Sequence, residues 1–291
     1  MLLYFFTYGF LGWCTEVAYA TTKQGKFVNR GFLNGPICPI YGVGVSVVIY
    51  FLTPLSGNLI FLYVTSTILV TVLEGLTGYF IDKIFHHKWW DYSNQPLNIG
   101  GYVCLIFSLV WGVACVAIVK GIHPLIHKVL AMIPVVAGVV ILCVLSIALF
   151  ADLYVTASGI LKLNRKLEAM EKIAAELREF SDKVGENISE TVMDTMEIGE
   201  EGKQKLEELA EENRQKLEEL AEENRQKLEE LAEENRQKYE ARKEELRRKY
   251  EEISAERNRV ARRLVKAFPK MESRKHKELL EELKERARNR R

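Results

Sequence analysis

Two carboxylates within apolar stretches are the residues of this sequence best suited to chemistry. Glu16 lies in the apolar run 1–22, and Glu74 lies in the apolar run 59–80. An ionised group near the centre of a membrane costs at least about 2.5 kcal/mol, so such residues usually serve a site. A carboxylate there can exchange a proton or hold a cation. The competing interpretation is that each group is protonated, or caps a contact between helices.

Residues 29–42 form a second stretch that could contribute to a site. Two prolines, Pro36 and Pro39, and three glycines interrupt an otherwise apolar segment there. Broken backbone at membrane depth persists only where protein or trapped water satisfies its polar groups, and discontinuous helices often carry a substrate or ion site. The stretch is therefore either a broken second helix that contributes to a site or a plain connecting loop.

The remaining polar residues of the apolar half fall near the same end of the expected helices. Asp82 and Asp152 lie near helix ends, and the others lie in the loops that follow the first and third apolar runs. The candidate substrate or ion site comprises Glu16, Arg30, Asn34, Pro36, Pro39, Glu74, Asp82, Asp91 and Asn98. We predict no catalytic residue, no cofactor and no metal site, because the sequence contains neither a metal-ligand spacing nor a phosphate-binding loop motif.

Five apolar runs must position these residues. They cover 1–22, 37–52, 59–80, 99–119 and 129–154. Most reach the roughly 20 residues that cross a bilayer, whereas the second is short. We therefore predict an all-α fold, in which residues 1–160 form a polytopic helical membrane bundle of about five transmembrane helices.

Small and aromatic residues indicate how these helices pack. Small residues allow two helices to approach closely, and polar ones hydrogen-bond across the contact. One face of the fourth run carries Ser108, Gly112 and Cys115. The residues predicted to pack between helices or to lie at the interface are Gly12, Trp13, Gly78, Trp89, Trp90 and Tyr92.

Loop charge predicts the orientation in the cell membrane. Eight basic residues lie in the first loop, in the third loop and at the start of the segment after the fifth run, against two in the other loops. Cytoplasmic loops carry the excess of Lys and Arg. We expect the N-terminus outside, and loops one and three with the C-terminal arm in the cytoplasm.

The second half of the chain is a charged arm. Residues 1–160 contain 7 basic and 5 acidic residues, and residues 161–291 contain 33 and 34. We expect juxtamembrane amphipathic helices with joints at Gly185, Gly199 and Gly202 over 161–203. An eleven-residue unit then repeats from Gln204, which predicts a helical rod over 204–258. The rod is either a homo-oligomeric coiled coil or a solitary charged helix supported by pairs such as Glu223 with Lys227.

Residues 259–291 form a basic tail. Three fates are open for it: it folds back, contacts anionic lipid or another acidic surface, or remains a solvated end, and the last is favoured. Specific nucleic-acid binding is not expected, because no aromatic residues are interleaved with the basic ones.

Several linear motifs resemble a known family. These are Trp13-Cys14-x-Glu16, Asn29 to Pro36 followed by Pro39-Ile40-Tyr41-Gly42, Glu74, and Trp89-x-Asp91-Tyr92-Ser93 with Asn98. They resemble the family Putative ABC-transporter type IV, which consists of bacterial multi-pass membrane proteins described as permeases. The resemblance covers about residues 1–160 and implies a transport subunit that works with a separate ATPase.

Three functions are therefore compared. The first is a permease-like transport subunit with a polar site open to the cytoplasm. The second is an enzyme that modifies lipid head groups at the inner leaflet, with Glu74 or Asp91 as base and Arg30 binding phosphate. The third is a membrane-anchored scaffold, for which the arm is essential. We favour the first, so we expect a non-enzymatic protein.

Overall fold

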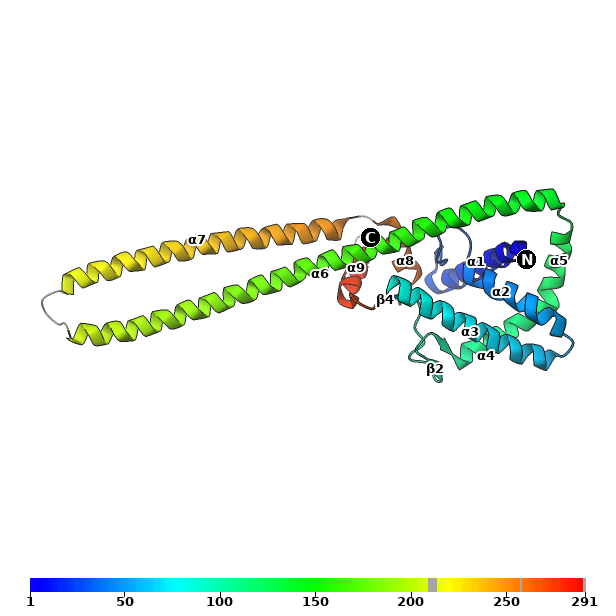
Figure 1. Ribbon diagram of the computed structural model, residues 1–291, viewed down its shortest axis with the longest axis horizontal. Coiled ribbons are helices and arrows are strands. Elements are labelled where there is room, and N and C mark those ends of the chain that lie inside the picture. Colours follow the sequence, from blue (N-terminus) through cyan, green and yellow to red (C-terminus); the bar gives the residue numbers. More distant parts are fainter. Residues whose placement is uncertain (209–213, 257, 290–291) are drawn as a thin grey trace. The chain divides into compact units, whose positions relative to one another are not determined.

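The computed structural model describes residues 1–208, 214–256 and 258–289 (Figure 1). For parts of 184–232, and for 287–289, the description is confined to the backbone. The chain divides into two compact units. Unit 1 contains Met1–Arg165 and Arg257–Arg291, and unit 2 contains Lys166–Glu256.

Unit 1 is built from apolar helices. They are α1 (Leu2–Gln24), α2 (Pro39–Leu52) with a short 3-10 turn (Thr53–Leu55), α3 (Leu59–Phe85), α4 (Leu105–Ala117), a π-helical segment (Ile118–Ile122), α5 (His123–Ala131) and the first part of α6 (Val135–Glu208). Three helical stretches among the described residues are long and apolar enough to cross a membrane: Leu59–Phe85, Leu105–Ala131 and Val135–Lys183. The all-α membrane class is therefore confirmed.

The expected limits of the membrane helices need correction. Of the five predicted spans, α2 is a short apolar helix, and α1 lies outside the three spanning candidates because tyrosines, threonines and Glu16 dilute its apolar character. The connection expected between the fourth and fifth runs is helical: a π-helical segment runs directly into α5, and Pro124 lies in the first turn of α5. One helical stretch, Leu105–Ala131, therefore replaces the end of the fourth run and the start of the fifth.

The stretch 29–42 is not a broken helix. Residues 25–38 form an irregular connection with bends at 25–26 and 31–36, and α2 begins at Pro39, so the connecting-loop alternative holds. The backbone N–H of Cys38 donates to the carbonyl oxygen of Gly9 at 2.9 Å, which ties the end of this connection to α1.

Small residues set the helix contacts in unit 1. Helix α1 packs on α2 with Gly12 against the ring of Tyr41, and α3 packs on α4 with Thr67 against Gly112. Ser108, Gly112 and Cys115 are the buried residues of α4, which confirms the predicted packing face. Many large apolar side chains of α3, α4 and α6 remain exposed, as expected for surfaces that face lipid.

The basic tail folds back onto unit 1. It comprises α8 (Arg259–Ala267), β4 (Glu272–Ser273) and α9 (Lys277–Asn289). Strand β4 pairs antiparallel with β1 (His87–Lys88), and β2 (Asn98–Ile99) pairs antiparallel with β3 (Val103–Cys104). Ala267 and Phe268 pack against Ala20 and Val28. The favoured expectation of a solvated end was wrong, because α8 has an apolar face that is buried here.

Unit 2 pairs two long helices of the same chain. The rings of Phe180 on α6 and Tyr239 on α7 (Arg214–Ala255) lie 5.0 Å apart. Lys166 Nζ donates to the carbonyl oxygen of Ser254 at 2.9 Å, so the two helices run antiparallel, as Figure 1 shows. Within the predicted rod 204–258, residues 214–255 form the helix α7, and residues 209–213 lie outside the described part of the chain.

The structure contradicts the glycine joints predicted in the arm and contains the predicted ion pair between Glu223 and Lys227. The joints predicted at Gly185, Gly199 and Gly202 are wrong, because α6 is one helix through Glu208. The pair Glu223–Lys227 forms at 2.7 Å. The repeat's apolar positions, from Leu206 to Ala232, and the pair Glu212–Lys216 lie outside the described side chains. Association of the rod into a homo-oligomer stays a prediction.

Candidate functional site

Glu16 is bound by two partners near the end of α1. Its Oε2 lies 3.2 Å from Nε of Arg30, and its Oε1 accepts a hydrogen bond of 2.6 Å from the hydroxyl of Tyr41 on α2. The Arg30 guanidinium also lies 4.6 Å from the ring centroid of Tyr19. Both carboxylate oxygens of Glu16 therefore have a partner within unit 1.

The loop after α1 is shaped by Asn29. The Oδ1 atom of Asn29 accepts from Trp13 Nε1 at 2.8 Å and from the backbone N–H of Gly31 at 3.1 Å. Its Nδ2 donates to the carbonyl oxygen of Asn34 at 2.6 Å. Trp13 therefore serves the loop as a hydrogen-bond donor. Pro36 is exposed in this loop, and Pro39 provides the first residue of α2.

Asp152 of α6 closes the other side of the same loop. Its Oδ1 accepts from the backbone N–H and the side-chain Nδ2 of Asn34 at 3.0 and 2.7 Å. Its Oδ2 accepts from the backbone N–H of Gly35 at 2.6 Å. Asn34 Nδ2 also donates to Thr156 at 3.0 Å. Asp152 was not among the predicted site residues, although its position near a helix end was noted.

Arg263 of the tail enters this loop from α8. Its Nε donates to Asn34 Oδ1 at 2.9 Å, and its two terminal nitrogens donate to the carbonyl oxygens of Gly31 and Phe32 at 2.7 Å each. Burial lowers the pKa of the Arg263 guanidinium below its usual value, while Asp152 acts in the opposite direction. Arg263 was not among the predicted site residues, and the arginine-rich composition of the tail was a weak signal of its role.

Glu74 lies in a separate contact on α3. Its Oε1 accepts a hydrogen bond of 3.3 Å from the hydroxyl of Tyr92, which comes from the loop between α3 and α4. Its Oε2 is buried and has no hydrogen-bond partner among the described residues. Unpartnered buried polar atoms are rare in folded proteins, and they often mark a functional group.

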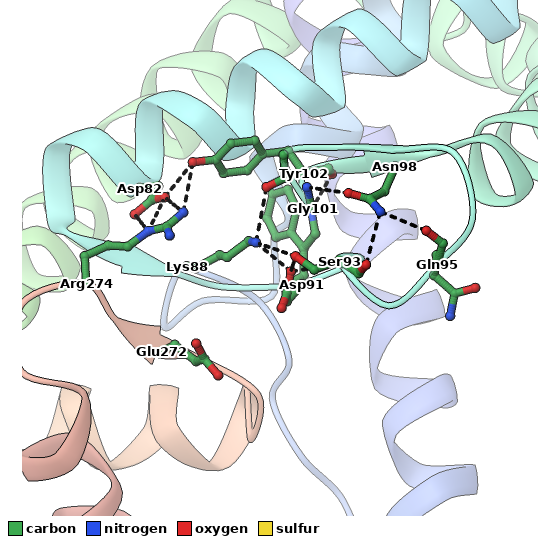
Figure 2. A network of polar contacts seen from close by, with 12 residues as sticks. Asp82, Lys88, Asp91, Ser93, Gln95, Asn98, Gly101, Tyr102, Glu272 and Arg274 are labelled. Carbon is green, nitrogen blue, oxygen red and sulfur yellow. Dashed lines mark hydrogen bonds and ion pairs between the residues drawn. The ribbon is translucent and has the colours of Figure 1, made fainter.

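Asp82, one turn from the end of α3, binds the second tail arginine. Arg274 donates to Asp82 Oδ2 from Nε at 2.9 Å and from Nη2 at 2.6 Å, as Figure 2 shows. The hydroxyl of Tyr102 donates to the same oxygen at 2.6 Å. The Asp82 carboxylate raises the pKa of Arg274 above its usual value. The loop between α3 and α4 and the tail thus meet at one carboxylate of α3.

Asp91 is held inside its own loop. Lys88 Nζ lies 2.5 Å from Asp91 Oδ1, which also accepts from the hydroxyl and the backbone N–H of Ser93 at 2.6 and 3.0 Å. These partners outweigh partial burial and lower the pKa of Asp91 to about 2. Lys88 Nζ also donates to the carbonyl oxygen of Gly100 at 3.2 Å. Asp91 is therefore an ionised structural group.

Asn98 organises the same loop (Figure 2). Its Nδ2 donates to the carbonyl oxygens of Ser93 and Gln95 at 3.1 and 2.9 Å, and its Oδ1 accepts from the N–H of Gly101 at 3.1 Å. Gly101 has φ +73°, a left-handed conformation that a side chain rarely adopts. The role of Asn98 is to fix the turn.

The predicted packing residues surround these networks. Trp89 is buried, with ring centroids 5.2 Å from both Phe32 and Phe268. Trp90 Nε1 donates to the carbonyl oxygen of Tyr102 at 2.8 Å, and Gly78 leaves space for both rings. His87 is fully buried next to Trp89, and its Nε2 pairs with Asn164 at 2.7 Å.

Residues 25–38 and 86–104, together with the adjoining helix ends, form a region that we call the polar end. Most of the predicted site residues lie in it, whereas Glu74 lies in the middle of α3. No hydrogen bond or ion pair among the described residues joins Glu16 to Glu74. A shallow groove of about 410 Å³, open to the surroundings, lies between α3 and α4, away from these residues. Apolar side chains and one tyrosine line it: Leu59, Ile60, Tyr63, Val113, Val116 and Ala117.

A family model described as Putative ABC-transporter type IV matches residues 3–157. The chain belongs to this family. The matched range includes Glu16, Glu74, Asp82 and Asp152, whereas Arg263 and Arg274 lie beyond it. The resemblance expected from the motifs is thereby confirmed for the membrane part. Neither the curated proteins nor the solved structures contain a match to the chain.

Proposed function

We propose that this chain is a permease-like subunit of a transporter, with a polar site centred on Glu74 and open to the cytoplasmic side. Family membership and the three long apolar helices support the membrane location. We assign the polar end to the cytoplasm from the excess of Lys and Arg in its loops, which leaves the N-terminus outside. An ATPase on a separate chain is the proposed partner.

The buried, unpartnered Oε2 of Glu74 carries the proposal. A site that binds a proton or cation needs a ligand atom that the protein itself leaves unsatisfied. Glu16, Asp82 and Asp91 are each saturated by arginine, lysine or hydroxyl groups, whereas Glu74 has one tyrosine hydroxyl at 3.3 Å. Within this set, Glu74 is the carboxylate best suited to exchange a proton.

The loop that supplies Tyr92 links this carboxylate to the polar end. Tyr92 lies on the same loop as Lys88, Asp91 and Asn98. Its backbone N–H donates a hydrogen bond of 2.9 Å to the carbonyl oxygen of Gly101. Displacement of the loop would remove the Tyr92 hydroxyl from Glu74 and admit water. The proposed cycle is protonation of Glu74 from the polar end, followed by transfer across the helix bundle.

The alternatives have less support. For a lipid-modifying enzyme, Glu74 or Asp91 would act as base and Arg30 would bind phosphate, but Asp91 and Arg30 are paired with Lys88 and Glu16. A scaffold would lose its function when residues 204–291 are deleted, whereas the transport proposal expects the membrane part to retain its proton pathway.

Voltage-driven proton uptake tests the proposal. The full chain is reconstituted in liposomes that contain a pH-sensitive dye, and a potassium gradient with valinomycin sets the membrane potential. We expect faster acidification than in protein-free liposomes, loss of this rate in Glu74→Gln, and retention in Glu179→Gln. Glu179 provides the matched control, because it forms an exposed surface pair with Lys183 at 2.8 Å.

Two results would contradict the proposal. One is a wild-type rate equal to that of protein-free liposomes. The other is an unchanged rate in Glu74→Gln, provided that this variant elutes in size-exclusion chromatography as the wild type does.

A further inference from the structure

Arg263 makes an unusually complete set of contacts for one tail residue. Its guanidinium donates to three acceptors, Asn34 Oδ1, Gly31 O and Phe32 O, at 2.9, 2.7 and 2.7 Å. All three acceptors lie within four consecutive residues of one loop. A planar guanidinium with donors in a fixed fork matches such a set, whereas the ammonium of lysine is a compact point charge.

The acceptors are held in place by groups of the membrane part itself. Asn29 fixes the N–H of Gly31 and the carbonyl oxygen of Asn34, and Asp152 fixes the N–H groups of Asn34 and Gly35. The N–H groups of Gly31, Asn34 and Gly35 are thereby bonded within the membrane part. The carbonyl oxygens of residues 31 and 32 remain available to a cation. The Asp152 carboxylate adds a negative charge next to them.

We call residues 29–35 and Asp152 the cradle. The cradle and Arg263, which binds in it, lie in different parts of the chain. The cradle residues 29–35 and Asp152 lie inside the range that matches the family, and Arg263 lies more than a hundred residues beyond it. Contacts of Asn258 and Val260 with Gly159 position Arg263 next to the cradle. Asn258 Nδ2 donates to the carbonyl oxygen of Gly159 at 2.8 Å, and Val260 packs against the same glycine.

We propose that residues 29–35, together with Asp152, form a guanidinium-binding site of the membrane part, and that Arg263 of the chain's own tail is its ligand. The tail thereby acts as a strap over the polar end. Once Arg263 is removed, a small guanidinium cation occupies the same cradle. This inference is independent of Glu74 and of proton transfer.

Chemical rescue tests the site in the full-length protein. Hydrogen exchange of the loop amides is compared in wild type, Arg263→Ala and Arg262→Ala. Arg262 is the matched control, because it is the exposed neighbour on the same helix. We expect Arg263→Ala to accelerate loop exchange by at least about tenfold, since a hydrogen bond to a charged group is worth more than that factor. Arg262→Ala leaves it unchanged.

Methylguanidinium is then added to each protein, with methylammonium at equal concentration as the control cation. At ten times its dissociation constant, methylguanidinium lowers the open fraction in Arg263→Ala by about tenfold. If methylguanidinium slows loop exchange in Arg263→Ala but not in wild type, the cradle is the site that Arg263 fills in the wild-type protein. An equally large effect in wild type, where Arg263 already fills the site, would mean that methylguanidinium binds elsewhere and would overturn the proposal.

The proposal is overturned if methylguanidinium fails to slow exchange in Arg263→Ala, or if methylammonium slows it equally. Should Arg263→Ala fail to fold, Arg263→Lys provides the test, because it keeps the charge and removes the fork. We expect hydrogen exchange of the loop amides to be faster than wild type in Arg263→Lys and equal to wild type in Arg262→Lys. Wild-type exchange in Arg263→Lys would mean that any cation suffices.

Discussion

Replacement of Arg274 by glutamine should partly release the C-terminal tail. Arg274 donates to Asp82 at 2.9 and 2.6 Å, and the Asp82 side chain is 7% exposed whereas that of Arg274 is 50% exposed. Breaking a buried ion pair costs about 3–5 kcal/mol, and an exposed pair contributes about 0–1 kcal/mol. Because Arg274 is half exposed and Tyr102 remains bound to Asp82, we expect a loss of about 2 kcal/mol.

That loss corresponds to about a thirtyfold larger fraction of detached tail. Hydrogen exchange of peptides covering 269–276 measures it, because the N–H of Arg274 donates to the carbonyl oxygen of His86 at 2.9 Å and becomes exposed when the tail leaves. Lys275→Gln, a change of the same sign at the exposed neighbour, is the control. If exchange in Arg274→Gln stays within twofold of that in Lys275→Gln, the pair is an ordinary surface contact, and the reasoning fails.

Two further predictions concern packing and pH. Gly12→Ala should destabilise unit 1 by about 1–3 kcal/mol, because its Cβ would meet the ring of Tyr41; Gly44→Ala, which has nothing within 4 Å, should be neutral in thermal unfolding. Burial lowers the pKa of His87, with a smaller opposing effect from its hydrogen bond to Asn164. The unfolded state therefore binds more protons, so stability should fall as pH decreases below about 6.5, and thermal unfolding of His87→Gln should lose this dependence.

The sequence predicted the membrane class well, because apolar runs are a local signal that needs no knowledge of long-range contacts. The third run became α3 with a small extension, and the packing face of α4 was identified from its small residues. The boundaries near 120–134 were wrong, since Lys120, Pro124 and Lys128 are typical of loops. In the structure, a π-helical segment and α5 continue the helix through them.

The sequence indicated which polar residues could contribute to the candidate site, but only in small part which of them contact each other. Most of the polar residues lie at the polar end, but which carboxylate binds which cation depends on contacts that residue spacing does not encode. Arg263 and Arg274 lie 229 and 192 residues from their partners Asn34 and Asp82. The local signs of docking were Asn258 before the helix and the apolar residues of α8 between arginines.

Carbodiimide labelling of Glu74 tests the central claim most directly, because it needs neither a substrate nor a partner ATPase. Carbodiimides react with protonated carboxyl groups, and peptide mass spectrometry locates the adduct. We predict that a hydrophobic carbodiimide modifies Glu74 in the reconstituted full-length protein, that low pH at the polar end accelerates the reaction, and that labelled protein loses proton uptake. If Glu74 remains unmodified while exposed carboxylates react, or if its modification leaves proton uptake intact, Glu74 is a packing residue and the proposed transport site is refuted.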